Sequence, residues 1–152
     1  MRRTIISDAS CFIILSNIGE MDLLRSVYSE IVTTPEIADE FGKQLPEWVV
    51  ISEVKDTTCK KVLKLQIDGG ESSAIALALE TPNSTLILDD HKARKVAHSL
   101  GLPYIGTIGV IVNAKLLGII PSIKPILDKM KATNFRLSIE IEQKALLAAK
   151  EI

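Results

Sequence analysis

The sequence predicts an α/β protein with one domain, residues 1–152, built on a parallel sheet. Short apolar runs alternate with segments of helical spacing, and parallel strands need a helical crossover between them. Two of these runs, residues 4–7 and 85–88, end directly on aspartates, which is typical of strands that carry ligands at the carboxyl edge of a sheet. Of the 152 residues, 47% are hydrophobic, which is enough for one buried core.

The overall composition argues against several classes of protein. A net charge of −1 gives no global preference for nucleic acid, so any basic surface has to be local. Cys11 and Cys59 fit neither a disulfide framework nor a zinc site, so a reducing cytoplasm is the expected location. Arg2 and Arg3 precede an apolar run as in a signal peptide, but Asp8 interrupts that run. We therefore expect no secretion signal and no membrane contact.

The first half of the chain predicts a regular series of strands and helices. Thr34 and Pro35 form a typical helix start, and Gly42 ends that helix. In a later amphipathic helix, Val62 and Leu65 are expected to point inward. In order, we expect strands at 4–7, 30–33 and 46–52, and helices at 10–18, 21–28, 35–41, 57–66 and 71–80.

The second half continues the same alternation and then becomes helical. Asp90, Thr107 and Ser138 are the expected helix caps, and Gly101 is expected to end its helix in a left-handed conformation. We expect strands at 85–88 and 103–105, and helices at 90–100, 108–117, 122–131 and 139–150.

Asp8 and Asp89 stand out because each follows an apolar strand. If the two strands are neighbours, their ends lie about 5 Å apart, close enough to share one divalent ion. Each aspartate could instead be a simple helix cap. The apolar residues after Asp90 follow helical spacing, so Asp90 fits the cap better and Asp89 the cleft, although either could be the metal ligand.

Two glutamates complete a candidate acidic cluster. Glu71 falls near the centre of the apolar face of its helix, a face that Ser72 and Ser73 are expected to avoid. Glu40 flanks the inward stripe of the helix that begins at Pro35. Oxygen ligands without His or Cys suit Mg²⁺ or Mn²⁺, and such clusters commonly serve phosphodiester hydrolysis.

The basic residues are a weaker indication. Arg94 and Lys95 follow the second acidic strand and are the expected RNA contacts, whereas His91 and His98 fall on the outer face of their helix and are expected to be solvated. The sequence contains no aromatic stacking platform.

Four motifs together resemble the PIN-domain family, in particular its short prokaryotic branch akin to VapC-type toxins. The resemblance covers a core of about residues 4–120, leaving 121–152 as a helical extension. The motifs are Asp8-Ala9-Ser10, Pro35-x-x-x-x-Glu40, Gly70-Glu71-x-x-Ala74-Ile75, and Leu88-Asp89-Asp90-x-x-Ala93-Arg94 with Gly106-Thr107-x-Gly109.

This resemblance implies a three-layer α/β/α sandwich with a five-stranded parallel sheet in the order 3-2-1-4-5. It also implies a Mg²⁺- or Mn²⁺-dependent ribonuclease, with an antitoxin partner and a homodimer. The implied catalytic quartet is Asp8, Glu40, Glu71 and Asp89, with metal at Asp8, Glu71, Asp89 and Asp90 and support from Ser10 and Thr107. Glu71 in place of aspartate and Leu88 in place of threonine or serine depart from the usual family pattern.

Three functions are compatible with these features. The leading hypothesis is a metal-dependent endoribonuclease, which in its finer form is the toxin of a toxin–antitoxin pair. The second is a PIN-like module that binds RNA or protein without catalysis. A phospho-acceptor signalling domain ranks last, because that fold needs paired acids after the first strand, where this chain has only Asp8.

Overall fold

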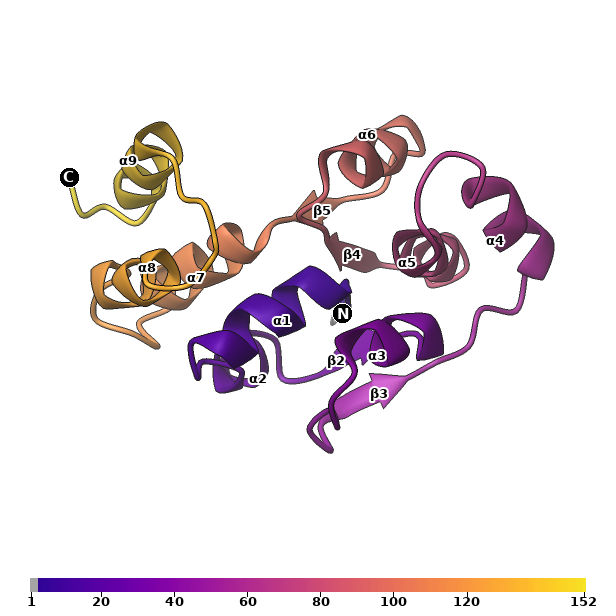
Figure 1. The fold of residues 1–152 in the computed structure, drawn as a ribbon, viewed down its shortest axis with the longest axis horizontal. Helices are drawn as coiled ribbons and strands as arrows, with labels where there is room; N and C mark the ends of the chain where they lie inside the picture. Colours follow the sequence, from indigo (N-terminus) through magenta and orange to yellow (C-terminus); the bar gives the residue numbers. More distant parts are fainter. Residues whose placement is uncertain (1–2) are drawn as a thin grey trace.

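The structure is a computed structural model that describes residues 3–152 (Figure 1). Within that range, five parallel strands form one sheet in the order β3-β2-β1-β4-β5, flanked by helices, which confirms the predicted sandwich. The strand order reverses between β1 and β4, and parallel sheets bind ligands at such a reversal. The strands are β1 Thr4–Ser7, β2 Ile31–Thr33, β3 Val49–Ile51, β4 Ser84–Ile87 and β5 Tyr104–Ile105.

The helices cover both faces of the sheet. In Figure 1, α1, α2 and α7 to α9 lie to the left of the strands, α4 and α5 lie to the right, and α6 lies above β4 and β5. None of the helices within residues 3–152 is long and apolar enough to cross a membrane. The helices are α1 Ala9–Asn17, α2 Asp22–Tyr28, α3 Pro35–Phe41, α4 Thr57–Leu63, α5 Gly69–Leu79, α6 His91–Ser99, α7 Thr107–Leu116, α8 Lys124–Lys131 and α9 Ile139–Ala148.

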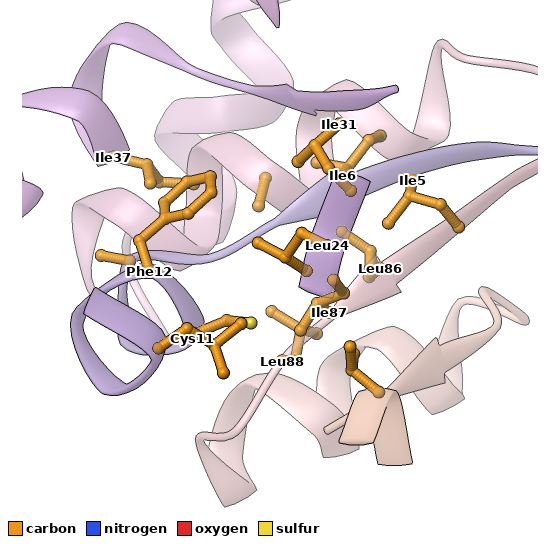
Figure 2. Close-up of a cluster of buried hydrophobic side chains, with 14 of the residues drawn as sticks. Ile5, Ile6, Cys11, Phe12, Leu24, Ile31, Ile37, Leu86, Ile87 and Leu88 are labelled. Carbon is orange, nitrogen blue, oxygen red and sulfur yellow. The ribbon is translucent and has the colours of Figure 1, made fainter. Parts of the chain in front are cut away.

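The core is built from aliphatic side chains around the central strands (Figure 2). Ile6 of β1 pairs with Val32 on one side and Leu86 on the other, and Ile6 and Leu86 are fully buried. Cys11 is also fully buried and belongs to this core as a small side chain. Each such aliphatic side chain contributes about 1.5–3 kcal/mol on burial, so the central strands are held rigidly beneath their carboxyl ends.

The predicted helix boundaries at Thr34, Gly42, Gly101 and Ser138 are confirmed. The Thr34 and Ser138 hydroxyls accept backbone N–H groups three residues later, at 3.2 and 3.1 Å. Gly42 and Gly101 have φ angles of +74° and +72°, the left-handed conformation that glycine adopts without strain.

The predicted inward face of α4 is wrong. Val62 and Leu65 are 54% and 84% exposed, whereas Leu63 is buried. The helix ends at Leu63, so Leu65 lies in the following turn and does not continue the helical stripe.

The prediction that α5 would be buried on one face only is also wrong. Ser72 and Ser73 are fully buried, and Leu79 at the end of the helix is 44% exposed. The helix contacts the sheet as well as α3, α4 and α6, so almost every side is covered. Its small residues allow this close packing, and they also hide the periodicity from a pattern based on hydrophobicity alone.

Candidate functional site

Asp8 lies at the end of β1, where the strand order of the sheet reverses. Its Oδ1 accepts the N–H of Cys11 at 2.9 Å, and its Oδ2 accepts the N–H of Asp89 at 3.0 Å. Burial, together with the charges of Asp89 and Glu40, raises the pKa of Asp8 to about 7, although the two N–H bonds oppose the shift. Asp8 therefore caps α1 and is at the same time a buried acid at the sheet edge.

Asp89 lies beside Asp8 because β1 and β4 are in register. Ser7 pairs with Ile87, so β1 and β4 end at neighbouring points of the sheet edge. The Asp89 carboxylate, however, turns toward the start of α7. Its Oδ1 accepts the N–H of Thr107 at 2.9 Å, and its Oδ2 accepts the Thr107 hydroxyl at 2.6 Å.

Thr107 does not cap α7, contrary to the sequence expectation. Gly106 occupies the cap position and makes no side-chain bond there. The Thr107 side chain is fully buried, and its hydroxyl donates to Asp89 instead. Thr107 is therefore a positioning residue for the carboxylate of Asp89.

Replacing Thr107 by valine should lower the free energy of unfolding by about 1.5–3 kcal/mol, because a buried bond to a charged oxygen is lost without a change of shape. Urea unfolding measures this loss. Thr107→Ser keeps the hydroxyl and should retain most of the stability. Equal losses in the two variants would contradict the role of the hydroxyl.

Asp90 caps α6, as the sequence predicts. Its Oδ2 accepts the N–H of Ala93 at 2.9 Å. Asp90 also lines a polar hollow with Asp68 and Glu71, flanked by Lys64. Asp90 is therefore the cap of α6, and Asp89 is not a cap.

Glu40 extends from α3 into a crevice that Asp8 and Glu71 also line, the acidic crevice of the site. A Cβ atom placed on Gly70 would lie 2.6 Å from Glu40 Oε1, so the carboxylate passes directly over the backbone of this glycine. Burial and the charge of Asp68 raise the pKa of Glu40. The small pocket at this point is lined by Asp8, Ala9, Ser10, Glu40, Gly70 and Glu71.

Glu71 begins α5 next to a second acid. Its N–H donates to Asp68 Oδ1 at 3.0 Å. A side-chain hydrogen bond to Glu71 lowers the pKa of Asp68. Burial first, and then the bond to Asp68 and the charges of Asp68, Asp90 and Glu40, raise the pKa of Glu71 to about 8. The two carboxyl groups therefore share a proton near neutral pH.

A buried polar link holds the helices of Glu40 and Glu71 together. The Ser73 hydroxyl donates to the Gly70 carbonyl at 2.7 Å, and the Thr34 and Ser73 hydroxyl oxygens are 2.6 Å apart. Because Ser73 uses its proton on Gly70, Thr34 donates to Ser73. The link joins the start of α3 to α5, which lie side by side.

Replacing Ser73 by alanine should lower the free energy of unfolding by about 1–3 kcal/mol, because the buried Thr34 hydroxyl loses its acceptor. Chemical denaturation provides the measurement. Ser26→Ala on the exposed surface of α2 is the control and should change stability by no more than about 0.5 kcal/mol. A similar small change in Ser73→Ala would refute the importance of the link.

The donor chemistry of the cluster fits a hard divalent cation, since it offers only carboxylate oxygens. Asp89 lies 3.9 Å from an Arg94 nitrogen, but Asp8, Glu40, Glu71 and Asp90 have no ion pair within residues 3–152. In the same range, no three His, Cys, Asp or Glu side chains are arranged to hold a metal ion as they stand. A cation would therefore require the carboxylates to rotate toward it.

The two residues expected to contact RNA are placed differently. Arg94 Nε donates to the Leu88 carbonyl at 2.7 Å, and its guanidinium carbon lies 5.6 Å from the centre of the Tyr104 ring. Lys95 is exposed on the outer side of α6. Arg94 is thus fixed between β4 and β5, and Lys95 is accessible.

The sequence indicates Asp68 as a helix cap and Gly70 as part of a family motif, but it does not predict that either residue belongs to the candidate site. The spacing of Asp68 and Glu71 matches a capping box and could have placed the two side chains together. The motif contains Gly70 but not the reason for it, because the requirement for glycine arises from the approach of Glu40 from another helix.

The comparisons with known proteins agree with this architecture. A family model described as a PIN domain matches residues 4–151. Neither the curated proteins nor the solved structures contain a match to the chain. PIN domains are generally nucleases and typically use divalent metal ions. Since the match covers nearly the whole chain, including α8 and α9, the protein belongs to the PIN-domain family.

Proposed function

We propose that the protein is a metal-dependent endoribonuclease. The observation that carries this proposal is the convergence of Asp8, Glu40 and Glu71 on one pocket at the reversal of the sheet, with no cation paired to them in residues 3–152. Like charges crowded in this way are costly unless a bound cation neutralises them.

Asp8, Glu71 and Asp89 would hold Mg²⁺ or Mn²⁺, with Asp90 as a further candidate ligand. The two N–H bonds of Asp8 leave one lone pair on each oxygen, and the bonds from Thr107 leave the same on Asp89. When bound, the metal would polarise the phosphate and lower the pKa of an attacking water.

Glu40 would orient the attacking water. It reaches the pocket on a flexible side chain, and its raised pKa makes it a better proton acceptor than an ordinary surface glutamate. Ser10 lines the same pocket and would support the site. Asp8 is held by two backbone hydrogen bonds and would therefore be the metal ligand that moves least.

Replacing Gly70 by alanine should lower Mn²⁺-dependent RNA cleavage by about 10-fold or more, because the new methyl group displaces the Glu40 carboxylate. The measurement is the cleavage rate of a single-stranded RNA in Mn²⁺, with EDTA as the blank. Alanine favours a helix over glycine, so stability should not fall.

Gly69→Ala is the matched control, one residue earlier in the same helical turn. A Cβ atom there would meet only Lys64, at an ordinary contact distance of 3.6 Å. This variant should cleave RNA like the wild type. Equal activity in Gly70→Ala would contradict the role of Glu40, and a wild type that never cleaves RNA in Mn²⁺ would contradict the endoribonuclease.

A finer proposal is that the enzyme is a VapC-like toxin, acting in the cytoplasm as a homodimer and held inactive by an antitoxin. The four sequence motifs support this branch of the family. Expression of the chain alone should arrest growth, and co-expression of a small DNA-binding protein encoded directly upstream should relieve the arrest. Growth that is unaffected by the active enzyme would contradict the toxin.

A second candidate is a binding module that recognises RNA or protein without catalysis. It is favoured by the absence, within residues 3–152, of three acids already arranged around a metal position. Calorimetric titration with Mn²⁺ separates the two candidates. No binding at millimolar metal would favour the module.

A further inference from the structure

We propose that a basic pocket between α6 and β5 binds the phosphates of the RNA strand as it leaves the acidic crevice. The identity of the ligand rests on the proposed function, but the pocket itself is a separate feature of the structure. It is lined by His91, Arg94, Lys95, His98, Ser99 and Tyr104.

The size and shape of this basic pocket suit a nucleotide strand. Its volume is about 500 Å³, within the range of pockets that accept nucleotide-sized ligands. His91, Lys95 and His98 recur at helical spacing and therefore form a stripe along one face of α6. At 1.5 Å of rise per residue the stripe is about 10 Å long, more than a single phosphate needs.

The basic pocket carries positive charge without acidic side chains beside it. Among the residues that the structure describes, no aspartate or glutamate lines it. His91, Lys95 and His98 make no side-chain hydrogen bond or ion pair within residues 3–152. Several other lysines are paired with acids: Lys60 with Glu36, Lys115 with Glu151, Lys129 with Glu20, Lys131 with Glu142 and Lys144 with Glu140. The pocket thus keeps positive charge available for an anion.

Arg94 connects the basic pocket to the acidic crevice. On one side it approaches Asp89, and on the other it stacks on Tyr104. A Cβ atom on Gly106 would collide with the Arg94 guanidinium, so glycine at that position leaves the space that Arg94 occupies. The Tyr104 ring makes a cation–π contact with the Arg94 guanidinium and so helps to hold it between the two sites.

The direction of α6 indicates how an RNA strand would lie on the basic pocket. The helix begins at His91, directly after Asp89 and Asp90, and runs away from them toward His98. A strand whose scissile phosphate lies at the acids would place its next phosphates along this stripe. An isolated phosphate ion would not use its full length. His91 and His98, expected from the sequence to be merely solvated, become ligand contacts in this arrangement.

The test is equilibrium binding of a fluorescein-labelled single-stranded RNA in EDTA, where metal-dependent cleavage does not occur. Lys95→Ala with His98→Ala should weaken binding by about 10-fold, and the slope of log K against log salt should fall by about 0.7 for each phosphate that the variant no longer neutralises. Lys95→Arg with His98 intact should keep the wild-type slope. Lys144→Ala on α9, whose side chain is 75% exposed, removes the same charge elsewhere and should bind like the wild type.

RNA cleavage in Mn²⁺ separates this proposal from the proposed function. A wild type that binds RNA but does not cleave it, with binding weakened about 10-fold in the double variant, supports the pocket and overturns the endoribonuclease. A wild type that cleaves RNA, with a double variant of unchanged KM, affinity and salt slope, overturns the pocket alone. RNA binding that is absent in the wild type overturns the pocket whatever the cleavage result.

Discussion

Asp8→Asn is expected to lower Mn²⁺-dependent RNA cleavage by at least about 100- to 1,000-fold, because it removes a charged ligand from the centre of the site. Asp8 is only 2% exposed and contacts the backbone of both α1 and the β4–α6 connection, so no other acid can take its place by a small movement. Single-turnover cleavage measures the loss at saturating enzyme. Full activity in this variant would rule out the proposed mechanism.

The same variant provides its own test of correct folding. Asparagine can accept only one of the two N–H bonds and turns its amide group toward the other donor, at a cost of about 1–3 kcal/mol that does not depend on pH. It also removes a charge that is unfavourable in the folded state. Loss of activity without general loss of structure is therefore the expected pattern.

The pH dependence of stability measures how much the ionised Asp8 carboxylate destabilises the folded protein. The pKa of Asp8 is raised from 3.8 to about 7, so the folded protein keeps a proton that the unfolded chain releases. The wild type should lose stability as the pH rises between these values, and the shift corresponds to about 4 kcal/mol once Asp8 is fully ionised. In EDTA, the stability of Asp8→Asn relative to the wild type should increase from about pH 4 to about pH 7. A difference that stays constant would contradict the raised pKa.

Much of the fold could be predicted because its signals are local. The strands are short apolar runs, and the caps at Thr34, Asp90 and Ser138 act on N–H groups three residues away. The errors at Val62 and Ser73 arose where tertiary contacts decide exposure. An amphipathic pattern cannot tell where α4 stops, and it cannot recognise a helix such as α5 that is covered on nearly all sides.

The candidate site, too, was predictable where its signals are local and unpredictable where tertiary placement decides. Strand ends and helix faces were enough to propose Asp8, Glu40, Glu71 and Asp89 as one cluster. They could not indicate that Asp89 turns to Thr107 while the other three acids line a common pocket. That difference depends on the relative placement of α3, α5 and α7, which no short sequence motif encodes.

Mn²⁺ should bind about 100- to 1,000-fold more tightly at pH 8 than at pH 6, because Asp8 and Glu71 must lose protons to become ligands. Their pKa values are raised to about 7 and about 8, so both are largely protonated at pH 6, whereas at pH 8 Asp8 is mostly ionised and Glu71 is about half ionised. Calorimetry in buffers of different ionisation enthalpy measures the affinity and counts the protons released. An affinity that does not change over this range would contradict Asp8 and Glu71 as ligands.

Asp68→Asn separates Glu71 from Asp8 in this titration without removing a proposed ligand. Asparagine caps a helix as well as aspartate does, so the bond to the Glu71 N–H should survive. The shared proton and the charge of Asp68 would be lost, so the pKa of Glu71 should fall toward its ordinary range. Burial still raises the pKa of Glu71 in this variant, so proton release on binding Mn²⁺ at pH 7 should decrease from more than one proton toward the half proton that Asp8 contributes. If Glu71 does not ligate the metal, the wild type and the variant should both release only about half a proton, whereas a complete failure of the variant to bind Mn²⁺ would mean that Asp68 itself is a ligand.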